Sequence, residues 1–198
     1  YLRAITKSAD RNASEIILDS VDEKMRKILG VHLWGIDDET PQDRAGALIS
    51  QLGLTLAVAE SCTGGHLAAA ISDVPGSSNY FKGALVPYRN ESKISTGVDS
   101  RIIEQFGVIS EECAVALARS ARDFFNADIG VGVTGVAGPS QQEEKPVGLV
   151  YIAIDVDGSV VNITRHQFPG RRPLIRGRAV AMALLQLCQI LSGGANTR

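Results

Sequence analysis

Chemically useful side chains gather in one stretch, residues 54–73, which reads LTLAVAESCTGGHLAAAISD. Its apolar first part predicts a short buried strand, and its alanine-rich last part predicts a helix. Between the two lies a set of small and polar residues: Ser61, Cys62, Thr63, Gly64 and Gly65. A strand that turns sharply into a helix exposes its turn residues at the carboxyl edge of a sheet, beside the free N–H groups of the helix start. The stretch therefore offers a candidate nucleophile next to a candidate oxyanion or phosphate cradle.

The same residues also allow a purely structural interpretation. Thr63 could cap the helix, the two glycines could serve a tight turn, and Cys62 could be a small core residue. The stretch matches neither the G-x-S-x-G nucleophile turn nor the G-x-x-x-x-G-K-[ST] phosphate loop. The local pattern alone leaves both interpretations open.

Two further segments follow strands that should end at the same edge of the sheet. Residues 80–88 predict a strand that leads into Tyr88–Lys93, and residues 129–134 predict a buried strand that leads into Thr134–Gly138. A serine needs a base to become nucleophilic near neutral pH, and no histidine has an evident position for a Ser-His-Asp arrangement. Lys93 is the better base, provided that burial or neighbouring groups lower its pKa toward about 7–8. The alternative for Lys93 is an exposed surface lysine.

The glycine-rich loop after the third of these strands allows the backbone to approach a ligand closely. Gly135 and Gly138, followed by Pro139, are the candidates for such a close approach. We expect the next segment, Gln141–Glu144, to form a mobile rim.

A local cluster of arginines surrounds the predicted start of the last helix: Arg165, Arg171, Arg172, Arg176 and Arg178. A helix N-terminus with arginine side chains is a ready phosphate site, because both present N–H donors to an anion. Arginine is otherwise unfavourable beside the positive end of a helix. The alternative is a solvated basic face.

The order of the predicted elements indicates an α/β fold. From residue 40 onward helices and strands alternate, which predicts helices on both faces of a mostly parallel sheet. Thr40 and Pro41 have the residue types of a helix start, and residues 172–191 predict the last helix. Residues 147–155 and 160–167 predict a hairpin, and its antiparallel pairing makes the sheet mixed.

Residues 1–39 form a separate small unit in this interpretation. We expect strands at Leu2–Thr6 and Val31–Trp34 around a helix that Asn12 or Ser14 caps and Gly30 ends. We therefore divide the chain into residues 1–39, a main domain over 40–192 and a disordered tail over 193–198. Because the chain opens on tyrosine rather than methionine, we also expect it to be a fragment of a longer protein.

Composition excludes several classes of protein. The chain has 198 residues and a net charge of −2, which argues against non-specific nucleic-acid binding. We find no apolar run of the ~20 residues that a membrane span needs, and no signal peptide. Cysteines at 62, 113 and 188 are odd in number and widely spaced, which indicates a reducing, cytoplasmic compartment without a disulfide framework. The three histidines are scattered as well, so we expect no metal site and no cofactor.

Six sequence runs together resemble the C-terminal domain of the CinA competence/damage-inducible family. They read AESCTGG, DVPGSSNYFKGALVPYRNESK, GVISEE, GVTGVAGP, EKPVG and FPGRR-x-x-IR. The resemblance covers about residues 40–191, in the family's order and spacing. The same domain occurs alone as nicotinamide mononucleotide deamidase. Residues 1–39 are similar to the tail of the middle domain that precedes it.

The resemblance implies a three-layer α/β/α sandwich and hydrolysis of nicotinamide mononucleotide to nicotinate mononucleotide and ammonia. It implies Ser61 as the nucleophile, Lys93 as its base and Tyr88 as an assisting group. It also places Thr134 in the substrate site and Arg172 on the substrate. Combining these roles with the residues above, we expect a Ser61–Lys93 dyad that needs no metal.

The remaining roles follow from the local patterns. Backbone N–H groups near Gly64 and Gly65 are expected to stabilise the oxyanion, with Thr63 beside them. Arg176, one helical turn after Arg172, is a second candidate for the substrate phosphate.

The chain departs from the family at three places: Pro87, Arg171 and the loop 140–144. These departures concern loop geometry and substrate affinity more than the chemistry. The alternative function is a non-catalytic nucleotide-binding or partner-binding module. Expected partners are nicotinamide mononucleotide, the preceding domains of a longer protein and a second copy of the chain, without membrane or direct nucleic-acid contacts.

Overall fold

The computed structural model describes residues 2–30, 33 and 35–194. The chain divides into two compact units, Tyr1–Asp38 and Glu39–Arg198, and each is described by itself.

The first unit is built on one helix, α1 (Arg11–Leu29). Asp10 is its N-cap, with the N–H of Asn12 donating to the Asp10 carboxylate at 3.2 Å, so the predicted caps Asn12 and Ser14 are wrong. Gly30 ends the helix as predicted. Leu2–Thr6 forms no strand, because no second strand lies beside it among the described residues. The predicted strand Val31–Trp34 lies largely outside the described residues.

The second unit contains a mixed five-stranded sheet of order β2-β1-β3-β4-β5. The strands are β1 (Leu56–Glu60), β2 (Phe81–Leu85), β3 (Ile129–Gly135), β4 (Leu149–Val156) and β5 (Ser159–Gln167). β1 pairs in parallel with both β2 and β3, whereas β4 pairs antiparallel with β3 and β5. Only β4 runs against the others, which confirms the mixed, mostly parallel sheet and the predicted hairpin.

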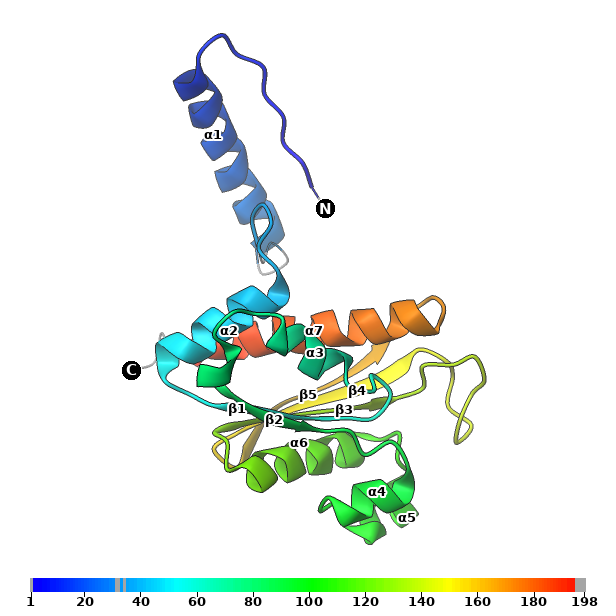
Figure 1. The fold of residues 1–198 in the computed structure, drawn as a ribbon. Coiled ribbons are helices and arrows are strands. Elements are labelled where there is room, and N and C mark those ends of the chain that lie inside the picture. The colour runs from blue at the N-terminus through cyan, green and yellow to red at the C-terminus, as the bar shows by residue number, and fades with distance from the viewer. Residues whose placement is uncertain (1, 31–32, 34, 195–198) are drawn as a thin grey trace. The chain divides into compact units, whose positions relative to one another are not determined.

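Helices cover both faces of this sheet, as Figure 1 shows. One face carries α2 (Pro41–Leu52), α3 (His66–Ser72) and α7 (Arg172–Gly194), and the other carries α6 (Glu111–Phe125) with α4 (Asn90–Ser95) and α5 (Ser100–Phe106). A short 3-10 turn, η2 (Ser77–Asn79), precedes β2. The fold is therefore the predicted three-layer α/β/α sandwich.

The predicted start of α2 is confirmed in detail. The Thr40 hydroxyl accepts from the N–H of Asp43, the Asp43 carboxylate accepts from the N–H of Thr40, and Pro41 occupies the first helical turn. This reciprocal capping box satisfies two N–H groups that the helix cannot satisfy itself.

Large and small residues alternate along the central strands, so the two faces of the sheet differ in how closely a helix can approach the backbone. Large side chains of β1 and β3, such as Leu56 and Val131, point into the core beneath α2, α3 and α7. The opposite face of β3 has Gly130 and Gly132, where an added Cβ would come within 2.0 Å and 2.1 Å of carbonyl oxygens of α6. Glycine at these two positions is what lets α6 lie directly against the sheet backbone.

Helix α7 is long and apolar enough by length and composition to cross a membrane, contrary to our count of apolar runs. Half of its most apolar 18-residue stretch is buried, and Ile175, Leu184 and Leu187 pack into the core against the sheet. Helices in a protein core are commonly this long and apolar, so packing against the sheet explains the composition of α7. The helix continues through Gly194, two residues into the predicted tail, and residues 195–198 lie outside the described residues.

Candidate active site

The turn after β1 is held by an acidic side chain for which the sequence pattern predicted no role. Glu60, the last residue of β1, is fully buried, and its carboxylate faces the start of α3. The N–H groups of Gly65 and Leu67 each donate to Oε2 at 3.0 Å, and that of Ala68 donates to Oε1 at 2.8 Å. The positive end of α3 is therefore filled by the chain's own carboxylate.

We expect Glu60→Ala to lower the free energy of unfolding by at least about 2 kcal/mol, because three N–H groups lose their acceptor. That change corresponds to a fall of roughly 4–8 °C in the melting temperature of a domain of this size. Thermal unfolding followed by circular dichroism measures it. Glu104→Ala on exposed α5 is the control and should stay within about 0.5 kcal/mol; equal losses in both variants would contradict the capping role.

The expected oxyanion donors near Gly64 and Gly65 are wrong, because the turn uses both N–H groups internally. The Gly64 N–H donates to the Ser61 carbonyl at 3.2 Å, and the Gly65 N–H is taken by the buried carboxylate. Within the described part of the chain, the N–H groups of Cys62 and Thr63 donate to no other residue, and that of Cys62 interacts only with its own thiol. The donors available next to the serine are therefore one and two residues after it.

Ser61 stands at the carboxyl end of β1 with its backbone fixed to the neighbouring strand. Its N–H donates to the carbonyl of Val133 at 2.9 Å, and the residue is 9% exposed. Burial raises the pKa of the adjacent Cys62 thiol to about 12, with smaller opposing effects from Arg172 and Arg176. Cys62 is thus a neutral thiol near pH 7, which is a poor nucleophile.

Lys93 is buried in α4 rather than exposed on the surface. Its side chain is 1% exposed, and Nζ donates to the carbonyl oxygens of Pro87 at 3.0 Å and Tyr88 at 3.3 Å. Burial lowers the pKa of Lys93, while Cys113, Cys62 and Glu143 act weakly against that shift. The departure at Pro87 is harmless here, because the bond uses a carbonyl that every residue has.

No hydrogen bond joins Ser61 Oγ to Nζ of Lys93 among the described residues. Both residues nevertheless line the same cavity, at the carboxyl ends of the parallel strands β1 and β2. Catalytic hydrogen bonds are often long before substrate binds, so this arrangement is compatible with a dyad.

Arg172, at the start of α7, joins two walls of the cavity. One guanidinium nitrogen donates to the Gly138 carbonyl at 2.8 Å, and another donates to the Tyr88 hydroxyl at 2.6 Å. Arg176 points elsewhere, since its Nε and Nη2 donate to the Thr63 carbonyl at 3.1 Å and 2.5 Å. The two arginines that we paired as phosphate candidates thus lie in different surroundings.

Thr134, near the end of β3, is 1% exposed, and its hydroxyl donates to the Val108 carbonyl at 2.6 Å. Gly135 and Gly138 both lack room for a side chain, because an added Cβ would lie 2.4 Å from the Leu149 carbonyl oxygen and 2.7 Å from Val147. Their close approach is therefore to the protein itself.

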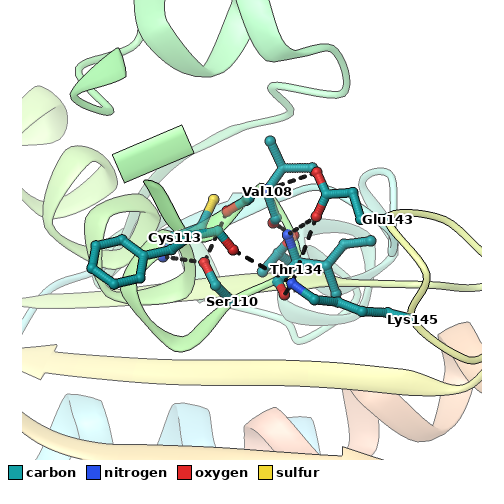
Figure 2. Close-up of polar contacts among 9 residues, drawn as sticks. Val108, Ser110, Cys113, Thr134, Glu143 and Lys145 are labelled. Atoms are coloured by element: carbon teal, nitrogen blue, oxygen red, sulfur yellow. Dashed lines mark hydrogen bonds and ion pairs between the residues drawn. The ribbon is translucent and has the colours of Figure 1, made fainter. Parts of the chain in front are cut away.

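The loop 140–145 contains Gln141–Glu144, which we expected to be a mobile rim, and it is tied to the segment between α5 and α6 (Figure 2). The Glu143 carboxylate accepts hydrogen bonds from the N–H groups of Val108 and Ile109, and Lys145 donates to the carbonyl of Ile109. These contacts fasten the loop, so the expectation of a free rim is wrong.

The cavity that these segments enclose has a volume of about 430 Å³. It brings together seven of the predicted site residues: Ser61, Tyr88, Lys93, Thr134, Gly135, Gly138 and Arg172. Four others, Thr63, Gly64, Gly65 and Arg176, do not line it. Among the residues that the structure describes, no group of three histidine, cysteine or acidic side chains could hold a metal ion.

Fold and cavity together define an α/β protein with a polar cavity at the carboxyl edge of its parallel strands, where such folds commonly bind ligands. The chain belongs to the CinA family: residues 38–191 match the model of the CinA C-terminal domain. It is 41% identical over 192 residues to a competence-damage inducible protein of Moorella thermoacetica, covering 96% of this chain and 46% of that protein. The chain thus spans less than half the length of this relative.

Solved structures give the same result. The competence/damage inducible protein CihA of Agrobacterium tumefaciens is 32% identical, with a TM-score of 0.71 over 80% of this chain and 99% of its own. A CinA superfamily protein of Enterobacter cloacae is 27% identical, with a TM-score of 0.75 over 80% and 96% of the two chains.

Proposed function

We propose that this domain hydrolyses the carboxamide of nicotinamide mononucleotide to nicotinate mononucleotide and ammonia. The observation that carries the proposal is Lys93, a buried amine in the same cavity as Ser61. No carboxylate pairs with Lys93 among the described residues, and burial lowers its pKa. A buried lysine of this kind is unfavourable for stability and suits a general base.

The two hydrogen bonds of Lys93 match the needs of a base. A neutral amine has two N–H groups and one lone pair, and the carbonyls of Pro87 and Tyr88 accept both N–H groups. The lone pair is left for a third partner, which in this proposal is the Ser61 hydroxyl.

The reaction then proceeds through an acyl-enzyme. Lys93 takes the proton of Ser61 Oγ as Oγ bonds to the carboxamide carbon, and the carbonyl electron pair moves onto oxygen. The intermediate collapses, the C–N bond breaks, and protonated Lys93 gives its proton to the departing nitrogen, which leaves as ammonia. Lys93 next deprotonates a water that attacks the ester carbon. The C–O bond to Ser61 breaks, and Lys93 returns the proton to Oγ.

The oxyanion is assigned to the backbone N–H groups of Cys62 and Thr63. They follow the nucleophile directly and donate to no other residue in the described part of the chain. Such pre-positioned donors stabilise the charge that develops on the carbonyl oxygen.

Thr134 is assigned as an acceptor for the carboxamide N–H. Its own hydroxyl proton is used on the Val108 carbonyl, so only its lone pairs remain for a ligand. The carboxylate product has no N–H to offer, and an acceptor in this position therefore favours the amide over the acid.

Arg172 is assigned to the 5′-phosphate, a part of the substrate remote from the reacting group. We expect Arg172→Ala to lower kcat/KM for nicotinamide mononucleotide about tenfold to a hundredfold, which matches one charge-assisted hydrogen bond. Nicotinamide riboside, which lacks the phosphate, should lose little. Steady-state kinetics on both substrates measure the ratio, and an equal loss on the riboside would mean that Arg172 acts only by joining Tyr88 to Gly138.

Incubation of the 198-residue chain with nicotinamide mononucleotide tests the proposal as a whole. Ammonia and nicotinate mononucleotide should form in equal amounts, with no dependence on added metal. Tight binding of the nucleotide without turnover would instead favour the alternative, a non-catalytic nucleotide-binding module.

Two broader assignments accompany this function. We place the domain, with its boundary near residue 39, inside a longer protein whose preceding domains and second copy are its partners. The described cysteines are all free, which supports a reducing, cytoplasmic setting.

A further inference from the structure

One wall of the cavity is an irregular segment whose backbone is held by side chains from elsewhere. Val108 and Ile109, which lie in sequence between the end of α5 and the start of α6, line the cavity. Their N–H groups donate to the two carboxylate oxygens of Glu143, at 3.0 Å and 3.2 Å. Among the described residues no strand pairs with this segment, so its position depends on such bonds.

Lys145 donates hydrogen bonds to carbonyl groups of the same segment. Its Nζ donates to Ile109 O and, at 3.4 Å, to Phe106 O, and lies 3.7 Å from Oε2 of Glu143. Glu143 thus accepts hydrogen bonds from the N–H groups of this stretch of backbone, and Lys145 donates to its carbonyl groups, as Figure 2 shows. Hydrogen bonds to charged groups are stronger than those between neutral groups.

The segment in turn orients Thr134. The Val108 carbonyl accepts the Thr134 hydroxyl proton, so any shift of Val108 changes which way that hydroxyl donates. Glu143 holds the N–H of the same residue. A chain of contacts therefore runs from Glu143 through Val108 to the cavity.

The backbone of the loop supports a functional interpretation. Glu143 and Glu144 adopt φ of 51° and 57°, a left-handed conformation that is unfavourable for residues other than glycine. Such conformations persist where the surrounding contacts over-determine them, and they cluster at functional sites.

We propose that Glu143 and Lys145 are positioning residues that fix the Thr134 hydroxyl as an acceptor by clamping residues 106–109. The inference rests on the proposed amidohydrolase function for its kinetic consequence. Its structural part, the clamping, is independent of that function.

A double-mutant cycle in the 198-residue chain tests the coupling. Glu143→Ala should lower kcat/KM for nicotinamide mononucleotide about tenfold, close to the loss in Thr134→Val, because both remove one oriented hydrogen bond. The double variant should be little worse than Thr134→Val alone, since Glu143 acts through Thr134. Losses that multiply would overturn the inference.

Two matched variants separate positioning from general loosening. Glu144→Ala changes the neighbouring residue, which has no hydrogen bond or ion pair in the described chain, and should leave kcat/KM unchanged. Lys145→Met should lower the efficiency, and Lys145→Arg should restore most of it, because arginine retains the donors to the carbonyl groups. A Glu144→Ala loss equal to that of Glu143→Ala would contradict a specific role.

Amide hydrogen exchange supplies a readout that needs no turnover. In Glu143→Ala the Val108 and Ile109 N–H groups should exchange at least about tenfold faster than in the parent chain and in Glu144→Ala. Unchanged exchange would overturn the clamping whether or not the protein deamidates any nucleotide. Faster exchange in a chain that shows no deamidation would retain the clamp and refute the proposed function.

Discussion

Ser61→Ala should reduce the turnover of nicotinamide mononucleotide at least about a thousandfold, with little change in the melting temperature. The hydroxyl that forms the covalent bond is lost, and removal of a nucleophile has effects of this size elsewhere. The backbone contacts of Ser61, which fix the turn, do not involve its side chain. Initial rates of ammonia release, with substrate binding measured by calorimetry, check the prediction.

Cys62→Ala is the control, because the thiol is the adjacent candidate nucleophile. Burial raises its pKa to about 12, so the thiolate is nearly absent near neutral pH, and most of the turnover should remain. Retained activity in Ser61→Ala together with its loss in Cys62→Ala would show that sulfur, not oxygen, attacks the substrate.

Lys93→Met should depress turnover about as strongly as Ser61→Ala, because methionine fills similar space without a basic nitrogen. The Ser61→Ala, Lys93→Met double variant should be little worse than either single variant, since the pair acts as a unit. Single-turnover rates in all three variants make the comparison. Rate losses that multiply would exclude a shared proton-transfer step.

The pH dependence follows from the direction of the Lys93 shift. Burial lowers the pKa of Lys93 from its ordinary 10.5, and the neutral amine that acts as a base exists only above that lowered pKa. The rate should therefore rise with pH through the lowered pKa and then level off. Between that pKa and 10.5 the folded protein binds fewer protons than the unfolded chain, so the free energy of unfolding should rise with pH there. Lys93→Met should remove both effects.

Features encoded by neighbouring residues were predictable from the sequence. The capping box at Thr40, the hairpin of β4 and β5, and the buried strands β1 and β3 each follow from short patterns in sequence. Ser61 and Thr134 lie at the same edge of the sheet because β1 and β3 run parallel, which was also predictable. These elements together account for the sheet and for most of the cavity lining.

Other features depend on contacts that no short pattern reports. Helices α4 and α5 have six and seven residues, too few for a periodic signal, and α4 decides that Lys93 is buried. Nothing in the local sequence pattern indicates a role for Glu60, yet its carboxylate accepts three N–H groups at the start of α3 from inside the core. Glu143 bonds to backbone 35 residues away. Such pairs become visible only when the chain is folded.

The sulfur atoms of the chain make it well suited to site-directed labelling. All three cysteines are buried, and burial raises their pKa values to about 12 for Cys62 and about 11 for Cys113 and Cys188. Near pH 7.5 fewer than about one in a thousand of these groups is a thiolate, so maleimides should react with them slowly. One new cysteine at an exposed position such as Gln141 would then carry a spin or fluorescent probe alone, with the native residues left in place. Motions of the loop 140–145 could be followed directly in solution.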